Sequence, residues 1–268
     1  MNRPIAIIQA RLGSTRLPGK VLADLGGAPL LARMIERLRA ARTLAGIVVA
    51  TPDTPADAPL RALMGGLGVD CFAGSERDVL ARYAGAAAAC AADPIVRLTA
   101  DCPLIDPAIV DRCVETFLST PGCDYAGLGG AFPDGLDTEV IAARALAHVH
   151  REAYLRSDRE HVTPYIKSRP HEFRCVTVPF PAPLGAARWT VDEPRDLELV
   201  RAVFARLHRP GEVFGWQDIA ALLTREPALA RINTGIGRNA GYRRSLAEDL
   251  RDEAEAERAP TPNAEPLP

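Results

Sequence analysis

Short apolar runs alternate with longer segments of helical periodicity over the first 120 residues. Strands are predicted at 4–10, 46–51, 69–72 and 94–99. An amphipathic helix is predicted after the first loop, because apolar residues recur there at helical spacing: Leu30, Leu31, Met34, Ile35 and Leu38. This alternation is typical of βαβ units that build a mostly parallel sheet, so the predicted fold class is α/β.

Two helix starts in this region are marked by capping residues. Ser75 followed by Asp78 predicts a capping box, with Ser75 as the cap. Asp106 followed by Pro107 combines a side-chain cap with a proline at the first helical position. Residues 100–106 are therefore predicted to lie in a βα loop.

The pattern changes after residue 123, where glycines at 127–130 are followed by helical segments and an alternating strand at 173–179. We interpret 123–186 as an inserted lobe of mixed α/β structure within a domain spanning 1–245. A strand at 188–191 and helices at 194–207 and 216–223 are predicted to return to the core. The final segment, 246–268, is rich in Glu, Ala and Pro, which predicts a flexible tail without chemistry, disordered past Arg258.

Composition and charge narrow the possible functions. The 268 residues are 47% hydrophobic and 25% charged, as in an ordinary soluble enzyme. A net charge of -2 offers no basic field for nucleic acid or an anionic membrane, so neither is an expected partner. The apolar run at 5–10 ends too soon at Arg11 for a signal peptide, and no uncharged run is long enough to cross a membrane. We therefore expect a cytoplasmic protein.

The loop after the first strand, residues 10–20, is unusually basic. It holds Arg11, Arg16 and Lys20, whereas 32 Lys and Arg in 268 residues predict about one per ten. Gly13 would let the backbone approach a ligand closely, and Ser14 would add a hydroxyl donor. A polyphosphate ligand would explain this pattern, and a solvated basic surface turn is the alternative.

Two common nucleotide loops do not fit. The chain has no G-x-G-x-x-G at this point, and Gly19-Lys20 is followed by Val21 rather than Ser or Thr. This argues against dinucleotide binding and against P-loop hydrolysis.

Carboxylates follow two later elements. Asp101 closes the fourth predicted strand, which in the usual strand order lies beside the first, at the switch point where open α/β sheets bind ligands. Asp192 stands between the strand at 188–191 and the next helix. Magnesium favours one or two carboxylates together with phosphate oxygens and water. Spacing cannot show that the two aspartates meet, and either could instead be a cap or a loop ligand.

Several segments together resemble one family, the cytidylyltransferases of the spore-coat-polysaccharide type. They are related to the synthetases of CMP-activated 3-deoxy-manno-octulosonate and of CMP-sialic acid. The matching segments are IIQARLGSTRLPGKVL, VRLTADCPLIDP, PDGLDTEVI, DREHVTPYI and RWTVDEPRDLELVRAVF. The resemblance covers roughly residues 3 to 235. Glu193 stands where many relatives have Thr, although Asp192 and Pro194 are in place.

The resemblance implies a Rossmann-like nucleotidyltransferase (GT-A-like) fold. It also implies transfer of CMP from CTP to an acidic sugar or related metabolite, with release of pyrophosphate. By the family pattern, Arg16, Lys20 and Asp101 are the expected catalytic residues, and Asp101 and Asp192 the expected Mg²⁺ ligands. The expected nucleotide-binding residues are Ala10, Arg11, Gly13, Ser14, Arg16, Lys20, Thr99 and Ala100. Glu139, Arg159 and His161 fall where relatives hold the acceptor, in the lobe that commonly forms a homodimer contact.

Two other functions compete with this interpretation. A metal-dependent glycosyltransferase of similar fold typically has an Asp-x-Asp metal site, and no Asp-x-Asp occurs in the sequence. A nucleotide-binding module without turnover would not need both presumed metal carboxylates and both phosphate cations. The acceptor itself cannot be identified from the sequence.

Overall fold

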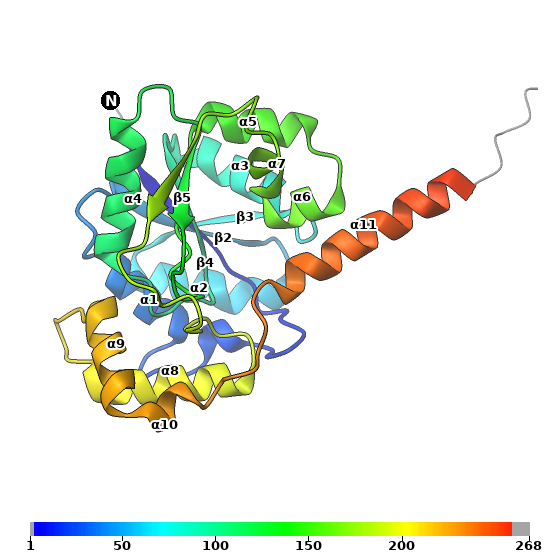
Figure 1. Ribbon diagram of the computed structural model, residues 1–268. Helices are drawn as coiled ribbons and strands as arrows, with labels where there is room; N and C mark the ends of the chain where they lie inside the picture. Colours follow the sequence, from blue (N-terminus) through cyan, green and yellow to red (C-terminus); the bar gives the residue numbers. More distant parts are fainter. Residues whose placement is uncertain (1–2, 259–268) are drawn as a thin grey trace, which may run out of the picture.

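The computed structural model describes residues 3–258, which form one seven-stranded sheet surrounded by helices (Figure 1). The strand order is β3-β2-β1-β4-β6-β5-β7. All neighbouring strands are parallel except β6, which is antiparallel to both β4 and β5. The strands are β1 (Ile5–Gln9), β2 (Gly46–Pro52), β3 (Asp70–Gly74), β4 (Ile95–Thr99), β5 (Tyr125–Gly129), β6 (Glu139–Ile141) and β7 (Cys175–Pro179).

Most of the predicted helices are present. The α-helices are α1 (Leu30–Leu38), α2 (Ala58–Leu67), α3 (Val79–Cys90), α4 (Pro107–Ser119), α5 (Ala143–Glu152), α6 (Arg156–His161), α7 (Pro164–Lys167), α8 (Pro194–Leu207), α9 (Trp216–Arg225), α10 (Pro227–Ala230) and α11 (Ala240–Arg258). Two 3₁₀ turns, η1 (Lys20–Leu22) and η2 (Pro55–Asp57), lie in loops. Asp106 caps α4 as predicted, accepting hydrogen bonds from the N–H groups of Ala108 and Ile109.

Apolar residues of the sheet pack on both of its faces. α3 contacts β1, β2 and β3, whereas α4 contacts β5, β6 and β7. A second apolar cluster joins α8 and α9 to the buried side chains of Trp189 and Val191. This cluster anchors the chain that precedes α8 through Trp189 and Val191.

Two local predictions differ from the structure. Residues 188–191 are not a strand, because a single bridge between Arg188 and Asp134 is their only ladder contact among the described residues. Asp78, not Ser75, caps α3 by accepting from the N–H of Ala81. The Ser75 hydroxyl instead accepts from the N–H of Asp78 in the preceding turn.

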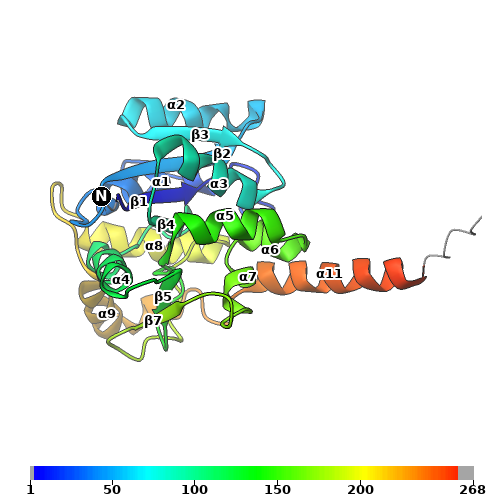
Figure 2. The ribbon, with the colours of Figure 1, turned by 90° about the horizontal axis from the view of Figure 1, so that it is seen from above.

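The strands of the expected lobe, β5, β6 and β7, extend the central sheet rather than forming a separate one. Part of the expected tail, residues 246–258, belongs to α11, which leaves the body of the molecule in both ribbon views (Figures 1 and 2). Residues 259–268 of that tail lie outside the described residues.

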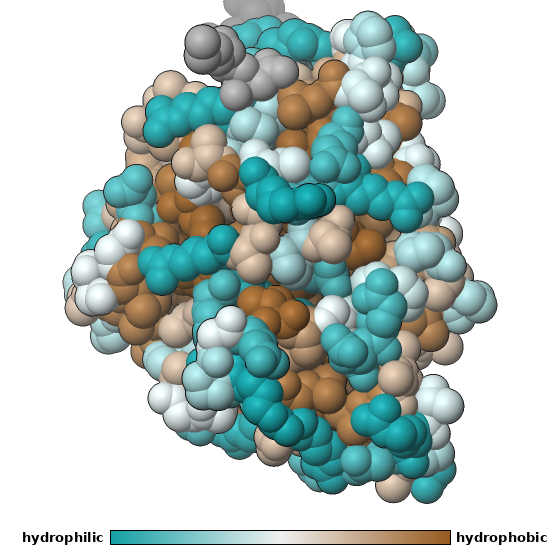
Figure 3. Space-filling model, turned by 90° about the vertical axis from the view of Figure 1, so that its left-hand side faces the viewer, coloured by the Kyte–Doolittle hydropathy of each residue, from teal (hydrophilic) through white to brown (hydrophobic). Residues whose placement is uncertain are grey.

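The surface near α4 is of mixed character. Figure 3 shows polar side chains interrupting apolar ones across one face of the molecule. Leu118 of α4 is one of the exposed large hydrophobic residues. Within residues 3–258, no helix combines the length and the apolar composition that crossing a membrane requires.

Candidate active site

The loop after β1 folds back on itself before it reaches η1. The N–H of Gly19 donates to the carbonyl of Leu12 at 3.0 Å, and the N–H of Leu12 donates to the Asp57 carboxylate at 2.8 Å. Gly19 has a φ of 70°, a left-handed conformation that a side chain would strain. The fold-back directs Lys20 toward the carboxyl end of β4.

Lys20 lies at the centre of the site. Its Nζ donates to Oδ2 of Asp101 at 3.2 Å, to Oδ1 of Asp192 at 2.9 Å and to the carbonyl of Val191 at 2.7 Å. Two aspartates that are far apart in the sequence therefore share one ammonium group. The loop after β1 and the loop after β4 face one crevice, as expected of neighbouring parallel strands.

Backbone contacts bring Asp192 to this position. The N–H of Val191 and the hydroxyl of Thr190 both donate to the carbonyl of Asp101, at 2.7 and 3.1 Å. These two hydrogen bonds hold the segment before α8 against the end of β4. The strand predicted at 188–191 gave no indication of this contact. Glu193 holds the N-cap position of α8, so the alternative of Asp192 as that cap is excluded.

Arg16 lies beside the same carboxylates. Its Nη2 is 3.0 Å from Oδ1 of Asp192, and its Nη1 is 3.7 Å from Oε1 of Glu193. Burial alone would raise the pKa of Asp192, but Lys20 and Arg16 outweigh burial and lower it. Burial alone would lower the pKa of Lys20, but Asp101 and Asp192 outweigh burial and raise it. Asp192 and Lys20 are therefore both charged at neutral pH.

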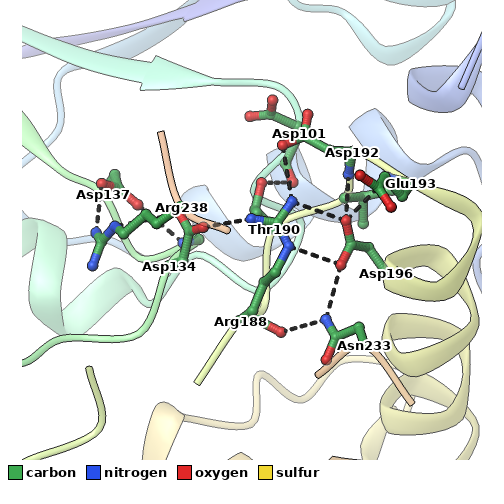
Figure 4. A network of polar contacts seen from close by, with 12 residues as sticks. Asp101, Asp134, Asp137, Arg188, Thr190, Asp192, Glu193, Asp196, Asn233 and Arg238 are labelled. Carbon is green, nitrogen blue, oxygen red and sulfur yellow. Dashed lines mark hydrogen bonds and ion pairs between the residues drawn. The ribbon is translucent and has the colours of Figure 1, made fainter. Parts of the chain in front are cut away.

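A buried arginine that the sequence analysis did not select holds Asp192 from the other side (Figure 4). Arg188 donates to Asp192 at 3.0 Å, to Asp134 at 2.7 Å and to both oxygens of Asp196 at 2.9 and 3.0 Å. The Asn233 amide donates to Asp196 and to the Arg188 carbonyl, both at 2.9 Å. A four-residue spacing predicts side-chain contact only within a helix, and residues 188–193 precede α8, so no local pattern in the sequence indicated these contacts of Arg188.

Asp134 extends the network toward the next loop. Its carboxylate pairs with Arg188 and with Arg238, and Arg238 also donates to Asp137 at 3.0 Å. Burial raises the pKa of Asp134 to about 6, and Asp137 adds to this effect although Arg238 and Arg188 oppose it.

This network has more negative than positive groups among the described side chains. Its carboxylates are Asp101, Asp134, Asp137, Asp192, Glu193 and Asp196. Its cations are Arg16, Lys20, Arg188 and Arg238. The excess of two negative charges matches the charge of one divalent cation.

The site offers few protein ligands, which suits magnesium better than a metal that needs a shell made entirely of protein side chains. No group of three or more His, Cys, Asp or Glu side chains within residues 3–258 is placed to hold a metal. Asp101 and Asp192 supply two carboxylates beside one ammonium, and Mg²⁺ usually completes its shell with water and substrate phosphates. The residues present therefore fit a metal that is shared with a nucleotide.

Glu139, on β6, lies at the opposite end of the site and is buried. Its oxygens accept from Lys167 at 2.5 Å, Tyr125 at 2.7 Å and Thr163 at 2.9 Å, and pair with Arg97. Burial alone would raise the pKa of Glu139, but Arg97 and Lys167 outweigh burial and hold it at about 2. Both carboxylate oxygens are thus engaged by the protein.

The other two residues expected at the acceptor differ in their placement. Nε2 of His161 lies 3.1 Å from the Ser245 hydroxyl. Arg159 instead donates to the Asp78 carboxylate at 2.5 and 2.8 Å and to two carbonyls of the α5 end. It joins α6 to the start of α3 and does not reach the cavity.

A cavity of about 840 Å³ connects these two ends. The expected site residues that line it are Ala10, Arg11, Ser14, Arg16, Lys20, Thr99, Ala100, Asp101, Glu139, His161 and Asp192. Gly13 and Arg159 do not line it. Residues between Asn239 and Glu248 form a further part of the wall, which the sequence analysis missed because this stretch has little apolar pattern.

A mostly parallel sheet with cations after β1 and a carboxylate after β4 defines the class as a nucleotidyltransferase of Rossmann-like fold. The family described as Cytidylyltransferase matches residues 5–202. The chain belongs to this cytidylyltransferase family, whose members are nucleotidyltransferases that use CTP.

Three known proteins illustrate the similarity. The spore coat polysaccharide biosynthesis protein SpsF of Bacillus subtilis (strain 168) is 34% identical, over 86% of this chain and 98% of that protein. A solved cytidylyltransferase from Leptospira borgpetersenii serovar Hardjo-bovis (strain JB197) superposes with a TM-score of 0.83 at 30% identity, over 88% of this chain and 100% of that chain. The 3-deoxy-manno-octulosonate cytidylyltransferase of Trichlorobacter lovleyi is 40% identical, over 44% of this chain and 46% of that protein.

Proposed function

We propose that this protein transfers CMP from CTP to an acidic sugar or related small metabolite and releases pyrophosphate, with Mg²⁺ bound at Asp101 and Asp192. The observation that supports this most is the contact of Lys20 Nζ with both carboxylates, at 3.2 and 2.9 Å. Phosphate-binding cations and metal-binding carboxylates thereby meet at the switch point between β1 and β4.

The first loop would hold the nucleotide. Arg16 and Lys20 are proposed to bind the phosphates, with Ala10 and Arg11 beside the base and ribose. The remaining proposed nucleotide contacts are Ser14, Thr99 and Ala100, which line the cavity, and Gly13, which lies in the same loop but outside the cavity wall. Bound Mg²⁺ would supply charge neutralisation at the phosphates.

In the proposed reaction an acceptor oxygen forms a bond to the α-phosphorus of CTP while the bond to the bridging β-phosphate oxygen breaks. The leaving group is pyrophosphate, and Arg16 and Lys20 stabilise the charge that develops on it. The rigid backbone link between Asp101 and residues 190–191 keeps both carboxylates oriented for this step.

The acidic acceptor is proposed from the names of the relatives and from the basic side chains at the cavity's far end. The Trichlorobacter relative is named for 3-deoxy-manno-octulosonate, an acidic sugar. His161, Lys167 and Arg97 line that end of the cavity. Glu139 forms ion pairs with Lys167 and Arg97 and so fixes their positions.

Pyrophosphate release tests the function directly. CTP, UTP, ATP and GTP are each incubated with octulosonic acids, nonulosonic acids and sugar phosphates in the presence of Mg²⁺. Asp101→Asn and Arg16→Ala should each lower turnover by about 10²-fold or more while the fold is kept. Asp70→Asn and Arg112→Ala change exposed residues away from the cavity and serve as matched controls.

The same screen separates the alternatives. Release of a nucleoside diphosphate in place of pyrophosphate would identify a glycosyltransferase. CTP binding by calorimetry, with no pyrophosphate from any acceptor, would identify a nucleotide-binding module. Near-normal turnover of both Asp101→Asn and Arg16→Ala would reject the proposed site.

We further propose a cytoplasmic homodimer with the 123–186 lobe at the contact. In support, β7 lies at one edge of the sheet, so its outer backbone groups are available for a partner, and Tyr154 of this lobe is 80% exposed. Light scattering tests the dimer, and a monomer at all concentrations would reject it. Cell fractionation tests the location.

A further inference from the structure

The cavity wall opposite the phosphate loop is built by a segment beyond the matched family region. Residues 5–202 match the family, whereas Tyr242, Arg244, Ser245 and Glu248 of α11 line the cavity. The first turns of α11 lie against α6, and the remainder of the helix extends away from the body (Figures 1 and 2). Only these first turns are therefore in a position to meet a ligand.

Buried polar contacts fix where the first turns of α11 lie. The buried Ser245 hydroxyl donates to Glu160 at 2.8 Å, and the Asp249 carboxylate accepts from the N–H of Ser157 at 3.2 and 3.3 Å. Such contacts are satisfied in one register only, so the helix cannot slide along α6 without leaving buried polar groups unpaired.

The same contacts set the orientation of His161. A hydroxyl has one proton, and Ser245 gives it to Glu160, so Nε2 of His161 is the donor in its 3.1 Å contact with Ser245. The ring of Tyr242 packs edge-on against His161 with centroids 5.2 Å apart. α11 therefore completes the surroundings of a residue proposed to face the acceptor.

Arg244 differs from the other cations at this end of the cavity. Lys167 is paired with Glu139 at 2.5 Å, and Arg156 with Glu248 at 3.3 Å. Among the side chains that the structure describes, none forms an ion pair or hydrogen bond with Arg244. Its guanidinium is thus available to a ligand, and its planar fork suits a carboxylate or phosphate group.

We infer that Arg244, presented by the first turns of α11, binds the anionic group of the acceptor and so determines the preference for an acidic sugar. This inference rests on the proposed function. The anion would lie near Arg244 and His161, on the cavity wall opposite the phosphate loop.

Kinetics of Arg244→Ala in the full-length protein test the inference, with 3-deoxy-manno-octulosonate and its neutral methyl ester as paired acceptors. Loss of one charge-assisted contact should raise KM for the acid by about 10-fold or more and leave KM for CTP within about 2-fold. KM for the ester should be equal in the wild type and the variant. Arg251→Ala, an exposed arginine two turns further along α11, is the matched control and should behave as the wild type.

Calorimetric titration with the same acid, and with a nonulosonic acid and a sugar phosphate, provides a measurement independent of turnover. Binding that depends on Arg244 without pyrophosphate release would support the inference and reject the proposed function. Pyrophosphate release with unchanged acceptor KM in Arg244→Ala, or with neutral acceptors only, would keep the function and overturn the inference. If the wild type binds none of the acids, the inference is overturned as well.

Discussion

Replacing Lys20 by methionine removes one charge from the centre of the site and keeps the length of the side chain. In the wild type, Nζ lies 3.2 Å from Asp101 and 2.9 Å from Asp192. At an effective dielectric constant of about 20, each pair is worth about 5 kcal/mol before desolvation is subtracted. The two aspartates lose different amounts, because Asp192 keeps Arg16 and Arg188 whereas Lys20 is the only cation paired with Asp101 among the described residues.

The net effect on stability lies between two known limits. Exposed ion pairs contribute about 0–1 kcal/mol, and breaking a buried pair costs about 3–5 kcal/mol. The side chain of Lys20 is 10% exposed and that of Asp101 27%, which places this pair between the limits. We expect Lys20→Met to lose about 2 kcal/mol, which lowers Tm by about 4–8 °C for a chain of this size.

The same change should strengthen metal binding. A divalent ion at Asp101 and Asp192 must displace the ammonium of Lys20, and the variant has no ammonium to displace. If about 2 kcal/mol is recovered, Mg²⁺ should bind about 30-fold tighter to Lys20→Met than to the wild type. Turnover should nevertheless fall by about 10²–10³-fold, because the charge on the leaving phosphates loses its partner.

Thermal unfolding with and without Mg²⁺, calorimetric titration with MgCl₂ and pyrophosphate release measure the three effects. Lys167→Met is the control for metal affinity, since Lys167 pairs with Glu139 at the far end of the cavity. An unchanged Tm together with unchanged Mg²⁺ affinity would refute the idea that metal and lysine compete for the same two carboxylates.

Three further results are expected. Glu139 has a folded pKa of about 2 against an ordinary 4.5, so its stabilising effect is complete above pH 4.5 and is lost as pH falls toward 2. The free energy of unfolding of Glu139→Gln should therefore depend less on pH between 4.5 and 2 than that of the wild type, as measured by acid unfolding. Arg188→Ala leaves the fully buried Asp196 without its cation and should cost about 3–5 kcal/mol in urea unfolding, a smaller loss being contrary evidence. Arg159→Ala should lower Tm through Asp78 yet leave acceptor KM unchanged, and a raised KM would restore its role at the acceptor.

Periodicity and capping were sufficient to predict the elements that surround the nucleotide side of the cavity. Strand β4 and the Asp106 cap were expected from apolar runs and an Asp-Pro start, and both are present. Because neighbouring parallel strands end at the same edge, the pattern also placed Asp101 beside the first strand at the switch point, and Lys20 of the loop after that strand lies 3.2 Å from Asp101.

Long-range geometry limited the rest of the prediction. The position of Asp192 depends on two hydrogen bonds from residues 190 and 191 to the Asp101 carbonyl, across about 90 residues of chain, and no local pattern encodes them. Asp249 lies in the segment where composition suggested a tail, and Ser245 directly precedes that segment. Neither contact was expected, because the docking of α11 on α6 uses buried polar groups instead of an apolar stripe. Polar interfaces of this kind carry little periodic signal.

The charged side chains of this site neutralise one another in this structure. When CTP and a metal bind, these side chains would exchange their protein partners for the ligands, so that no new unpaired buried charge would form. Arg16 and Lys20 neutralise Asp192 and Asp101 in this structure, and the network still has two more carboxylates than cations. A nucleotide alone would compete with these carboxylates for the two cations, and a divalent ion alone would compete with Lys20 for the carboxylates. Together they would satisfy both sets of groups, because in the proposed complex the metal binds the aspartates while the phosphates bind Arg16 and Lys20. Each ligand therefore removes the competitor of the other, so CTP and the metal should each raise the affinity of the other by the same factor.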